Sequence, residues 1–362
     1  MNDTTEFIDY ESQFEIDWAA LKNHLATRNV ILELDEVPRQ FSGGAANINF
    51  KIKLDNRAAV LRCPPPGPLP KGSNDVGREF RVISALNGHF PYVPSPIFYE
   101  PEESVIGTPF CISEFIDGIV IRRDLPSEFC STPQIGKALS EILVTTMAEL
   151  HSIDYEAVGL STIGKPLKYL ERQLSGWSTR GKAVLSESRY MLLESINKRL
   201  FRMLPSNRTI CLVHNDFKLD NMILCRRTLT PLAVLDWDMC TLGDPFLELV
   251  ILLLYWGEKN DTEPFSLLAR MPYNADGWLS RRQVIALYCE IRGLHLDQSA
   301  LKFYVIFALC RFAVIYAQLE QLYSEGGMNS AAFDNNDPNY TDHIISTLLR
   351  TAENLFDSPL PW

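Results

Sequence analysis

The chain has 362 residues, and 34 lysines and arginines against 45 aspartates and glutamates give a formal net charge of −11. With 46% hydrophobic and 22% charged residues, the composition excludes a disordered or fibrous protein. The length suits one large two-lobed unit or two domains. The acidic balance argues against nucleic acid or an anionic membrane as a partner, because both bind clustered lysine and arginine.

The N-terminal residues and the cysteines predict a cytoplasmic protein. Residues 1–17 are acidic, whereas secretory and mitochondrial leaders are basic. The longest apolar runs, 249–256 and 303–310, have eight residues each, while a membrane span needs roughly 20, so we expect buried core helices and no membrane partner. The eight cysteines are scattered without a CxxC pair, which favours reduced thiols over disulfides or a zinc site.

Short β-branched or alternating runs predict strands in the first part of the chain. They lie at 30–37, 47–54 and 58–63, and a further strand pair follows over 96–103 and 108–116. A proline-rich connector after the third run excludes helix and central strand. Apolar residues at helical spacing then predict one helix, capped by Ser73, Asn74 or Asp75 and ended by Gly88.

From about residue 132 the pattern becomes helical. Thr132 and Pro133 predict a helix start, two amphipathic helices follow over 166–204, and another helix opens at Asp244–Pro245. The segments CLVHND, NMILC and LAVLDWD predict short strands between them. The sequence therefore predicts an α+β protein, with an N-terminal lobe (1–113), a hinge (114–118) and a larger helical C-terminal lobe (119–362).

The strongest chemical signal is LVHNDFKLDNMILC followed by LAVLDWD, which supplies His214, Asp216, Asn221 and Asp236. Phosphoryl transfer requires a carboxylate that orients the acceptor and divalent cations that neutralise phosphate charge. Asp216 suits the base, and Asn221 and Asp236 offer the hard oxygen ligands that Mg²⁺ prefers. The spacing matches the kinase catalytic-loop signature His-x-Asp-x-x-x-x-Asn.

The N-terminal lobe carries a candidate phosphate site. QFSGGAANINF predicts strand–turn–strand with Ser42, Gly43 and Gly44 at the tip, where glycine lets backbone N–H groups approach phosphate. A plain hairpin turn explains this segment equally well. Arg62 ends a strand and Glu79 lies on the next helix. The guanidinium of an arginine can bind a carboxylate and a phosphate at the same time. A solvated surface pair is the alternative interpretation of Arg62 and Glu79.

Taken together, the motifs resemble the aminoglycoside phosphotransferase and choline kinase-like superfamily, which has the protein-kinase-like two-lobed fold. The chain is more closely similar to the phosphotransferase domains related to the kinase part of acyl-CoA dehydrogenase proteins. The similarity covers about residues 40–250 and is carried by FSGGAANINF, AAVLRCPPPG, GREFRVISAL, IGTPFCISEFIDG, MAELHSIDY, YLERQLSGW, LVHNDFKLDNMIL and VLDWDMCTLGDPFLEL. It implies a phosphotransferase that uses ATP and Mg²⁺. The HNDF and DWD forms point to a small-molecule hydroxyl acceptor rather than a protein.

The resemblance implies roles in transfer for individual residues. Asp216 would be the catalytic base, and Asn221 and Asp236 the Mg²⁺ ligands. Lys218 would be the cation at the γ-phosphate, although an exposed loop lysine is nearly as good an interpretation. Glu248 stands where the family often has aspartate, and we expect its carboxylate to support the catalytic loop.

The resemblance also places the nucleotide. Arg62 would contact its phosphates and would be held by Glu79. Backbone groups of Glu114 and Ile116, in the predicted hinge, would face adenine. These assignments predict that the N-terminal lobe and the hinge bind ATP.

The acceptor site is predicted from YLERQLSGW and the residues around DWD. Its candidate lining is Arg172, Trp177, Trp237, Asp238 and Trp256. Aromatic residues with one arginine suit a carboxylate or an acyl-thioester alcohol, whereas Asp238 would suit a cation. Core packing is the alternative for the tryptophans. Because no cluster of carboxylates for an aminoglycoside is visible, the resemblance favours a hydroxy acid or hydroxyacyl-CoA.

Other functions stay open at this stage. An aminoglycoside-type antibiotic phosphotransferase shares the same motifs. A nucleotide-binding pseudokinase that acts as a partner module is disfavoured by the intact set of Asp216, Asn221 and Asp236. A metal hydrolase would need histidine-rich ligation, and the motif offers His214 alone. The sequence makes no prediction of the oligomeric state.

Overall fold

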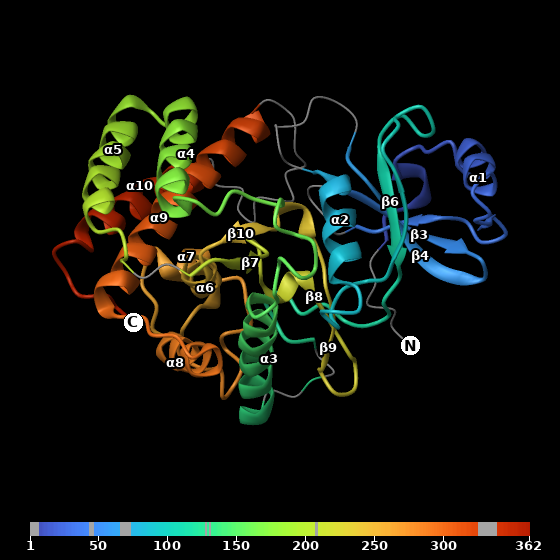
Figure 1. The fold of residues 1–362 in the computed structure, drawn as a ribbon. Helices are drawn as coiled ribbons and strands as arrows, with labels where there is room; N and C mark the ends of the chain where they lie inside the picture. The colour runs from blue at the N-terminus through green and yellow to red at the C-terminus, as the bar shows by residue number, and fades with distance from the viewer. Residues whose placement is uncertain are drawn as a thin grey trace. The chain divides into compact units, whose positions relative to one another are not determined.

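The computed structural model describes residues 7–42, 47–65, 74–126, 129, 132–206, 209–324 and 339–362. Contacts within the chain divide it into two compact units (Figure 1). Unit 1 consists of Met1–Val120, Glu156–Leu160 and Asn221–Cys240. Unit 2 consists of Ile121–Tyr155, Ser161–Asp220 and Thr241–Trp362.

Unit 1 is built on an antiparallel sheet of six strands in the order β1-β3-β4-β6-β5, with β2 paired to β3. The strands are β1 (Leu32–Glu33), β2 (Arg39–Gln40), β3 (Ile48–Leu54), β4 (Arg57–Cys63), β5 (Pro96–Glu100) and β6 (Phe110–Glu114). The side chains of Phe50, Ile52 and Leu54 alternate with less buried neighbours along β3. This period-two burial places one face of the strand in the core.

Helices α1 (Trp18–Ala26) and α2 (Val76–Leu86) complete this core. Trp18 packs edge-on against Phe50 of β3, with ring centroids 5.1 Å apart. The side chain of Asp75 accepts a hydrogen bond from the Arg78 N–H at 2.9 Å, so Asp75 is the N-cap among the three predicted candidates. Both the predicted helix and the central predicted strands are therefore present.

A second hairpin belongs to unit 1 although it comes late in the chain. It consists of β8 (Met222–Leu224) and β9 (Pro231–Val234), followed by the short helix η3 (Trp237–Met239). The Val234 N–H donates to the Tyr92 carbonyl at 2.7 Å, and Ile119 and Leu224 exchange two backbone hydrogen bonds of 2.8 Å. The compact units therefore differ from the predicted lobe boundaries here, because these bonds join residues 221–240 to the N-terminal segment.

Unit 2 is mainly helical. Its elements are α3 (Pro133–His151), α4 (Tyr169–Val184), α5 (Glu187–Arg202), β7 (Cys211–Val213), β10 (Thr241–Gly243), α6 (Pro245–Trp256), α7 (Phe265–Leu268), α8 (Arg281–Arg292), α9 (Gln298–Ser324) and α10 (Tyr340–Asn354). A short helix, η2 (Leu219–Asn221), lies where the chain passes to unit 1. Thr132 caps α3, as the Thr-Pro pair predicts. Together the sheet of unit 1 and the helices of unit 2 form a two-lobed α+β protein.

Two apolar helices form the centre of unit 2. Helix α6 is buried along nearly its whole length, and α9 contacts α4, α6 and α10 (Figure 1). Residues 298–322 are long and apolar enough to cross a membrane by length and composition, yet 78% of their most apolar window is buried inside the protein. Both helices pack as core helices, which is how their apolar runs were interpreted.

Candidate active site

Arg62, the second-last residue of β4, binds two carboxylates inside unit 1. Its Nε lies 2.6 Å from Oε2 of Glu79 on α2, and its Nη2 contacts Oδ1 of Asp236. Asn49, opposite Arg62 on β3, accepts a hydrogen bond from Nη1 at 3.4 Å. The side chains of Arg62 and Glu79 are only 15% and 10% exposed. The two residues therefore form a buried pair, and the alternative of a solvated surface pair is wrong.

This cluster holds more negative than positive charge. Burial, together with the charges of Asp236 and Asp238, raises the pKa of Glu79 to about 7, and Arg62 opposes this rise. Burial by itself disfavours the charge of Arg62, but Glu79 and Asp236 raise the pKa of the guanidinium above its ordinary value. Arg62 thus pairs with two carboxylates and lies in the field of a third, that of Asp238, so a bound cation would improve the local charge balance.

Asn221 and Asp236 lie at the same end of the β8–β9 hairpin. Met222 pairs with Val234 in the strand register, and the Leu235 N–H donates to the Asn221 carbonyl at 2.8 Å. Asp236 has a left-handed backbone, with φ of 70°, which is uncommon outside glycine and asparagine. The hairpin therefore presents an amide and a carboxylate next to the Arg62 cluster.

These residues fit a magnesium ion. Mg²⁺ usually takes one or two protein carboxylates and completes its shell with water and phosphate oxygens. Asp236 and Asn221 supply hard oxygen donors, and the acidic excess around Arg62 favours a divalent cation. Among the residues that the structure describes, no group of three or more His, Cys, Asp or Glu could hold a metal, so a site here would depend on ligands from a nucleotide.

In unit 2, the catalytic loop is fixed by the buried carboxylate of Glu248. The backbone N–H groups of His214 and Asn215 both donate to it, the former at 3.1 Å. His151 Nε2 lies 2.6 Å from Glu248 Oε2, and His151 Nδ1 lies 2.6 Å from the Tyr288 hydroxyl. Burial raises the pKa of Glu248, but the hydrogen bonds from His151 and the Asn215 N–H and the charges of His151 and His214 together outweigh burial, so the pKa lies below its ordinary value.

Glu248 supports the loop as expected from its position, whereas sequence reasoning missed the other two members of this network. The sequence motifs assign no role to His151 or to Tyr288. Their partners lie far away along the chain, at separations of 97 and 137 residues. A histidine at the end of an apolar helix was the only signal, and it does not specify a partner.

Asp216 and Lys218 form an ion pair on the same loop. Lys218 Nζ lies 3.0 Å from Asp216 Oδ2 and 5.3 Å from the ring centroid of Tyr255. Burial disfavours the lysine charge, but the Asp216 carboxylate raises the pKa of Lys218 above its ordinary value. Lys218 is therefore a half-buried, charged partner of the candidate base rather than an exposed loop lysine.

The predicted nucleotide contacts are partly visible. Strands β2 and β3 pair, and the Phe41 N–H donates to the Asn49 carbonyl at 3.0 Å, which leaves Ser42 at the start of the connecting turn. Gly43 and Gly44 lie outside the described residues.

The hinge residues differ from each other in their backbone bonds. The Glu114 N–H already donates to the Ser95 carbonyl at 2.9 Å, so this N–H cannot also face adenine; the Glu114 carbonyl stays a candidate. The Ile116 N–H makes no hydrogen bond with any residue that the structure describes. Ile116 therefore retains a donor for a ligand in the hinge.

The structure places three of the candidate acceptor residues in the protein interior, which agrees with core packing, the alternative interpretation of the tryptophans. Trp237 is fully buried, and its Nε1 donates to the Val234 carbonyl at 2.8 Å. Trp256 is fully buried too, and donates to the Leu279 carbonyl at 2.7 Å. Both indoles are core residues, because each N–H is satisfied inside its own unit. Asp238 is buried and acts electrostatically on Arg62 and Glu79, and its role toward an acceptor stays a prediction.

The remaining candidates lie on α4. Arg172 is exposed and donates to the Leu167 carbonyl at 3.0 Å. Trp177 is 6% exposed, and its Nε1 donates to Gln173 at 3.2 Å. The guanidinium of Arg180 lies 4.5 Å from a ring centroid of this tryptophan. Trp177 therefore forms part of an aromatic and cationic surface rather than an isolated pocket wall.

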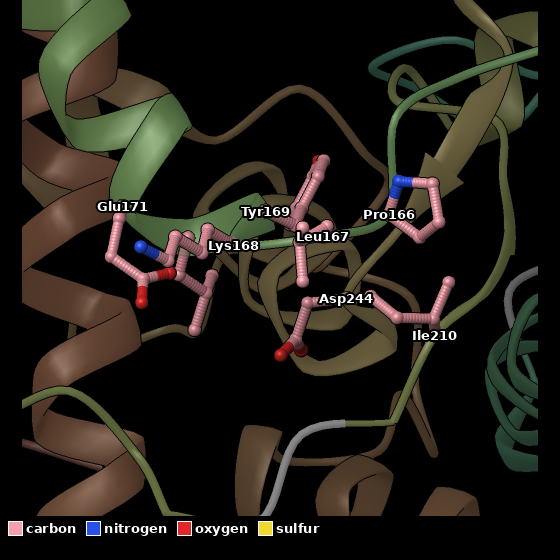
Figure 2. Close-up of a pocket in the computed structure, with 8 residues that line it drawn as sticks. Pro166, Leu167, Lys168, Tyr169, Glu171, Ile210 and Asp244 are labelled. Atoms are coloured by element: carbon pink, nitrogen blue, oxygen red, sulfur yellow. The ribbon is translucent and has the colours of Figure 1, made fainter.

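A pocket of about 610 Å³ opens at the start of α4 (Figure 2). Its lining includes the apolar side chains of Leu167, Tyr169 and Ile210 and the charged residues Lys168, Glu171 and Asp244. The Asp244 carboxylate accepts a hydrogen bond from the Tyr304 hydroxyl at 2.8 Å and caps the N-terminus of α6. The pocket can accommodate an apolar group, and no sequence motif pointed to it.

The chain carries four features of kinases in the expected order on a two-lobed α+β fold. They are a cation at the end of a strand (Arg62), a glutamate on the next helix (Glu79), the His-x-Asp-x-x-x-x-Asn loop and an aspartate after the following hairpin (Asp236). This combination defines a kinase-type phosphotransferase. Residues 37–283 match the model of the phosphotransferase enzyme family, APH. The chain belongs to that family.

Similar sequences extend the comparison. Acyl-CoA dehydrogenase family member 11 of Rattus norvegicus is 31% identical over 294 residues, which cover 80% of this chain and 37% of the relative. The probable acyl-CoA dehydrogenase IBR3 of Arabidopsis thaliana is 30% identical over 76% of this chain and 35% of its own length. The chain thus spans less than half the length of these relatives.

Solved structures share the fold. A protein from Ralstonia eutropha classed as an aminoglycoside phosphotransferase has a TM-score of 0.73 and 25% identity, covering 94% of this chain and 99% of that one. The ternary complex of streptomycin, ATP and APH(2")-IIa has a TM-score of 0.56 and 19% identity, covering 84% and 91%. The second comparison supports the fold alone.

Proposed function

We propose that this protein is an ATP- and Mg²⁺-dependent O-phosphotransferase that acts on the hydroxyl of a small molecule. A hydroxy acid or a hydroxyacyl-CoA is the acceptor that we favour. The observation that carries the proposal is the buried Arg62 cluster. In it the Arg62 guanidinium pairs with Glu79 and Asp236, and a kinase needs such residues next to the phosphates of its nucleotide.

The chain's own residues would divide the work between binding and proton transfer. Arg62, oriented by Glu79, would contact the nucleotide phosphates, and the Ile116 N–H would bind adenine. Asp216 would accept the proton of the acceptor hydroxyl, with Lys218 beside it as a positive charge near the transferring group. Asn221 and Asp236 would hold Mg²⁺, which when bound neutralises charge on the phosphate oxygens.

The acceptor class is supported by the relatives. Two of them carry the name acyl-CoA dehydrogenase, which is consistent with an acyl-CoA-derived alcohol. An aminoglycoside is the second candidate, because the Ralstonia eutropha structure similar over nearly the whole chain is classed with aminoglycoside phosphotransferases.

An acceptor screen tests this function. ATP consumption is measured with Mg²⁺ or EDTA against hydroxy acids, hydroxyacyl-CoA thioesters, choline-like amines and aminoglycosides. We expect Mg²⁺-dependent turnover with a hydroxy acid or its thioester. Turnover with an aminoglycoside alone would replace the favoured acceptor by the second candidate, and no turnover with any of them would contradict the proposal.

The variant Asp216→Asn tests the base. Because the carboxylate acts on the acceptor in the transition state, we expect kcat to fall by about 10²–10⁴-fold while ATP affinity changes little. Asp220→Asn, the same substitution on the same loop, is the matched control. Unchanged turnover in Asp216→Asn would remove this residue from the mechanism.

A further inference from the structure

Helix α9 carries a buried arginine that has no counter-ion among the residues that the structure describes. Arg311 is 4% exposed, and its Nε is buried without a hydrogen-bond partner. Arg311 makes no ion pair or hydrogen bond with any residue in the described part of the chain. Buried charges are ordinarily paired, because an unpaired charge loses its hydration without compensation. The missing partner is therefore a reason to look for a ligand.

A second arginine lies beside it. The guanidinium carbon of Arg311 lies 5.2 Å from a ring centroid of Trp177 on α4, and that of Arg180 lies 4.5 Å from it. Partial burial and the charge of Arg311 lower the pKa of Arg180, as expected for two neighbouring cations. Stacking on the indole stabilises both groups but leaves the Arg311 Nε–H without a hydrogen-bond partner among the described residues. An anion would satisfy this donor.

Packing connects this pair of cations to the catalytic loop. Tyr255 of α6 packs edge-on against Phe312, the neighbour of Arg311, with ring centroids 5.1 Å apart. Lys218 lies 5.3 Å from the same tyrosine ring and pairs with Asp216. Burial and Asp216 raise the pKa of Tyr255 to about 12, while Lys218 and Arg311 oppose the rise. Tyr255 thus lies within reach of both the catalytic pair and the buried arginine.

The apolar pocket at the start of α4 borders the same region. Tyr169 lines this pocket (Figure 2), and the charge of Arg311 opposes the rise that burial causes in the pKa of Tyr169. Tyr169 therefore lines the pocket and lies within the electrostatic range of the buried Arg311 cation. This combination suits a molecule with a hydrocarbon part and a negative group.

We propose that Arg311, with Arg180 at its rim, binds an anionic group of the phosphate acceptor. The group would be a carboxylate or a phosphate, which a guanidinium binds through two parallel hydrogen bonds. This inference rests on the proposed phosphotransferase function and narrows its acceptor to an anionic alcohol. It argues against aminoglycosides, because these polycations would be repelled by two arginines.

Calorimetric titration of the full chain without nucleotide tests the site. The probes are 4-hydroxybutyrate, its neutral amide and free coenzyme A, and the variants are Arg311→Met and, as a control on the exposed surface of α10, Arg350→Met. We expect Arg311→Met to weaken binding of the anionic probe by roughly 10- to 100-fold, with no change in Arg350→Met. Binding of hydroxybutyrate identifies a carboxylate site, and binding of coenzyme A identifies a phosphate site.

The thermal midpoint separates a binding role from a structural one. Removing an unpaired buried charge should raise the midpoint of Arg311→Met in the absence of anion, whereas loss of a structural arginine would lower it. If Arg311→Met does not fold, Arg180→Met at the exposed rim takes its place. For this variant we expect a loss of anion affinity of about two- to fivefold, with the midpoint unchanged.

Three results would overturn the anion site. They are failure of the wild type to bind either anion, equal affinity for hydroxybutyrate and its amide, and unchanged anion affinity in the arginine variants. The site and the enzymatic function can fail separately. Anion binding that depends on Arg311, without phosphoryl transfer to any acceptor, would contradict the function alone. Efficient transfer to a neutral or cationic acceptor without anion binding would contradict the site alone.

Discussion

The Glu248 network and the Arg62 cluster are built on opposite electrostatic designs. In unit 2, the Glu248 carboxylate is fully buried, and its hydrogen bonds to two backbone N–H groups and to His151 match its charge. In unit 1, Arg62 is shared among carboxylates that outnumber it. The hydrogen bonds of the Glu248 network are complete within the protein, whereas a bound cation would improve the charge balance of the Arg62 cluster.

This difference suggests how each network contributes to function. A saturated buried network stabilises one loop conformation whether or not a ligand is present. A cluster with excess negative charge retains affinity for a divalent cation, at some expense of the stability of the ligand-free protein. Substitutions should therefore affect mainly folding in the Glu248 network and mainly ligand binding in the Arg62 cluster.

The largest effect on stability is expected for Glu248→Ala. It removes the acceptor of two backbone N–H groups and leaves His151 without its carboxylate, so we expect a loss of about 3–5 kcal/mol in the free energy of unfolding. Urea denaturation measures it, with Glu149→Ala, an exposed glutamate on α3, as the control. A loss below about 1 kcal/mol would show that the network does not hold the catalytic loop.

Asp236→Ala should show the reverse pattern. The free energy of unfolding should change little, because the variant removes one of the carboxylates that surround Arg62. The affinity for Mg·ATP should fall by about 100-fold, because the charged metal ligand is lost. Calorimetry with and without Mg²⁺ measures this, and Asp35→Ala, a surface carboxylate of unit 1, is the control. Wild-type affinity in Asp236→Ala would disprove the metal assignment.

The smallest expected effect is a coupling energy. Arg62→Ala should weaken ATP binding and turnover together, while Glu79→Ala should slow turnover more than it weakens binding, because Arg62 keeps its charge and loses its orientation. The double variant should then be less than additive, with a coupling of about 0.5–3 kcal/mol. Values of kcat/KM for the three variants give this number. Additive losses would mean that the two residues do not act as a unit.

Sequence reasoning identified the residues that follow one another in motifs, and missed those that depend on packing. Arg62 and Glu79 were paired because a strand end and the next helix follow each other closely. The contact between Arg62 and Asp236 joins residues 174 positions apart, and only the hairpin bonds explain it. Trp237 was placed in the acceptor site because composition cannot distinguish a buried indole from a ligand-binding one. Arg311 was overlooked because it lies within an otherwise apolar helix, where the missing counter-ion is visible only in three dimensions.

The return of residues 221–240 to unit 1 has a consequence for dissecting this protein into fragments. A fragment that ends at Val120 would lack the strand partners of Tyr92 and Ile119, together with Asp236 and its contact to Arg62. Each unit consists of three separate segments, so no single cleavage of the chain yields two complete units. The protein is modular in its contacts but not in its covalent sequence, and unit 1 cannot be obtained as one continuous piece.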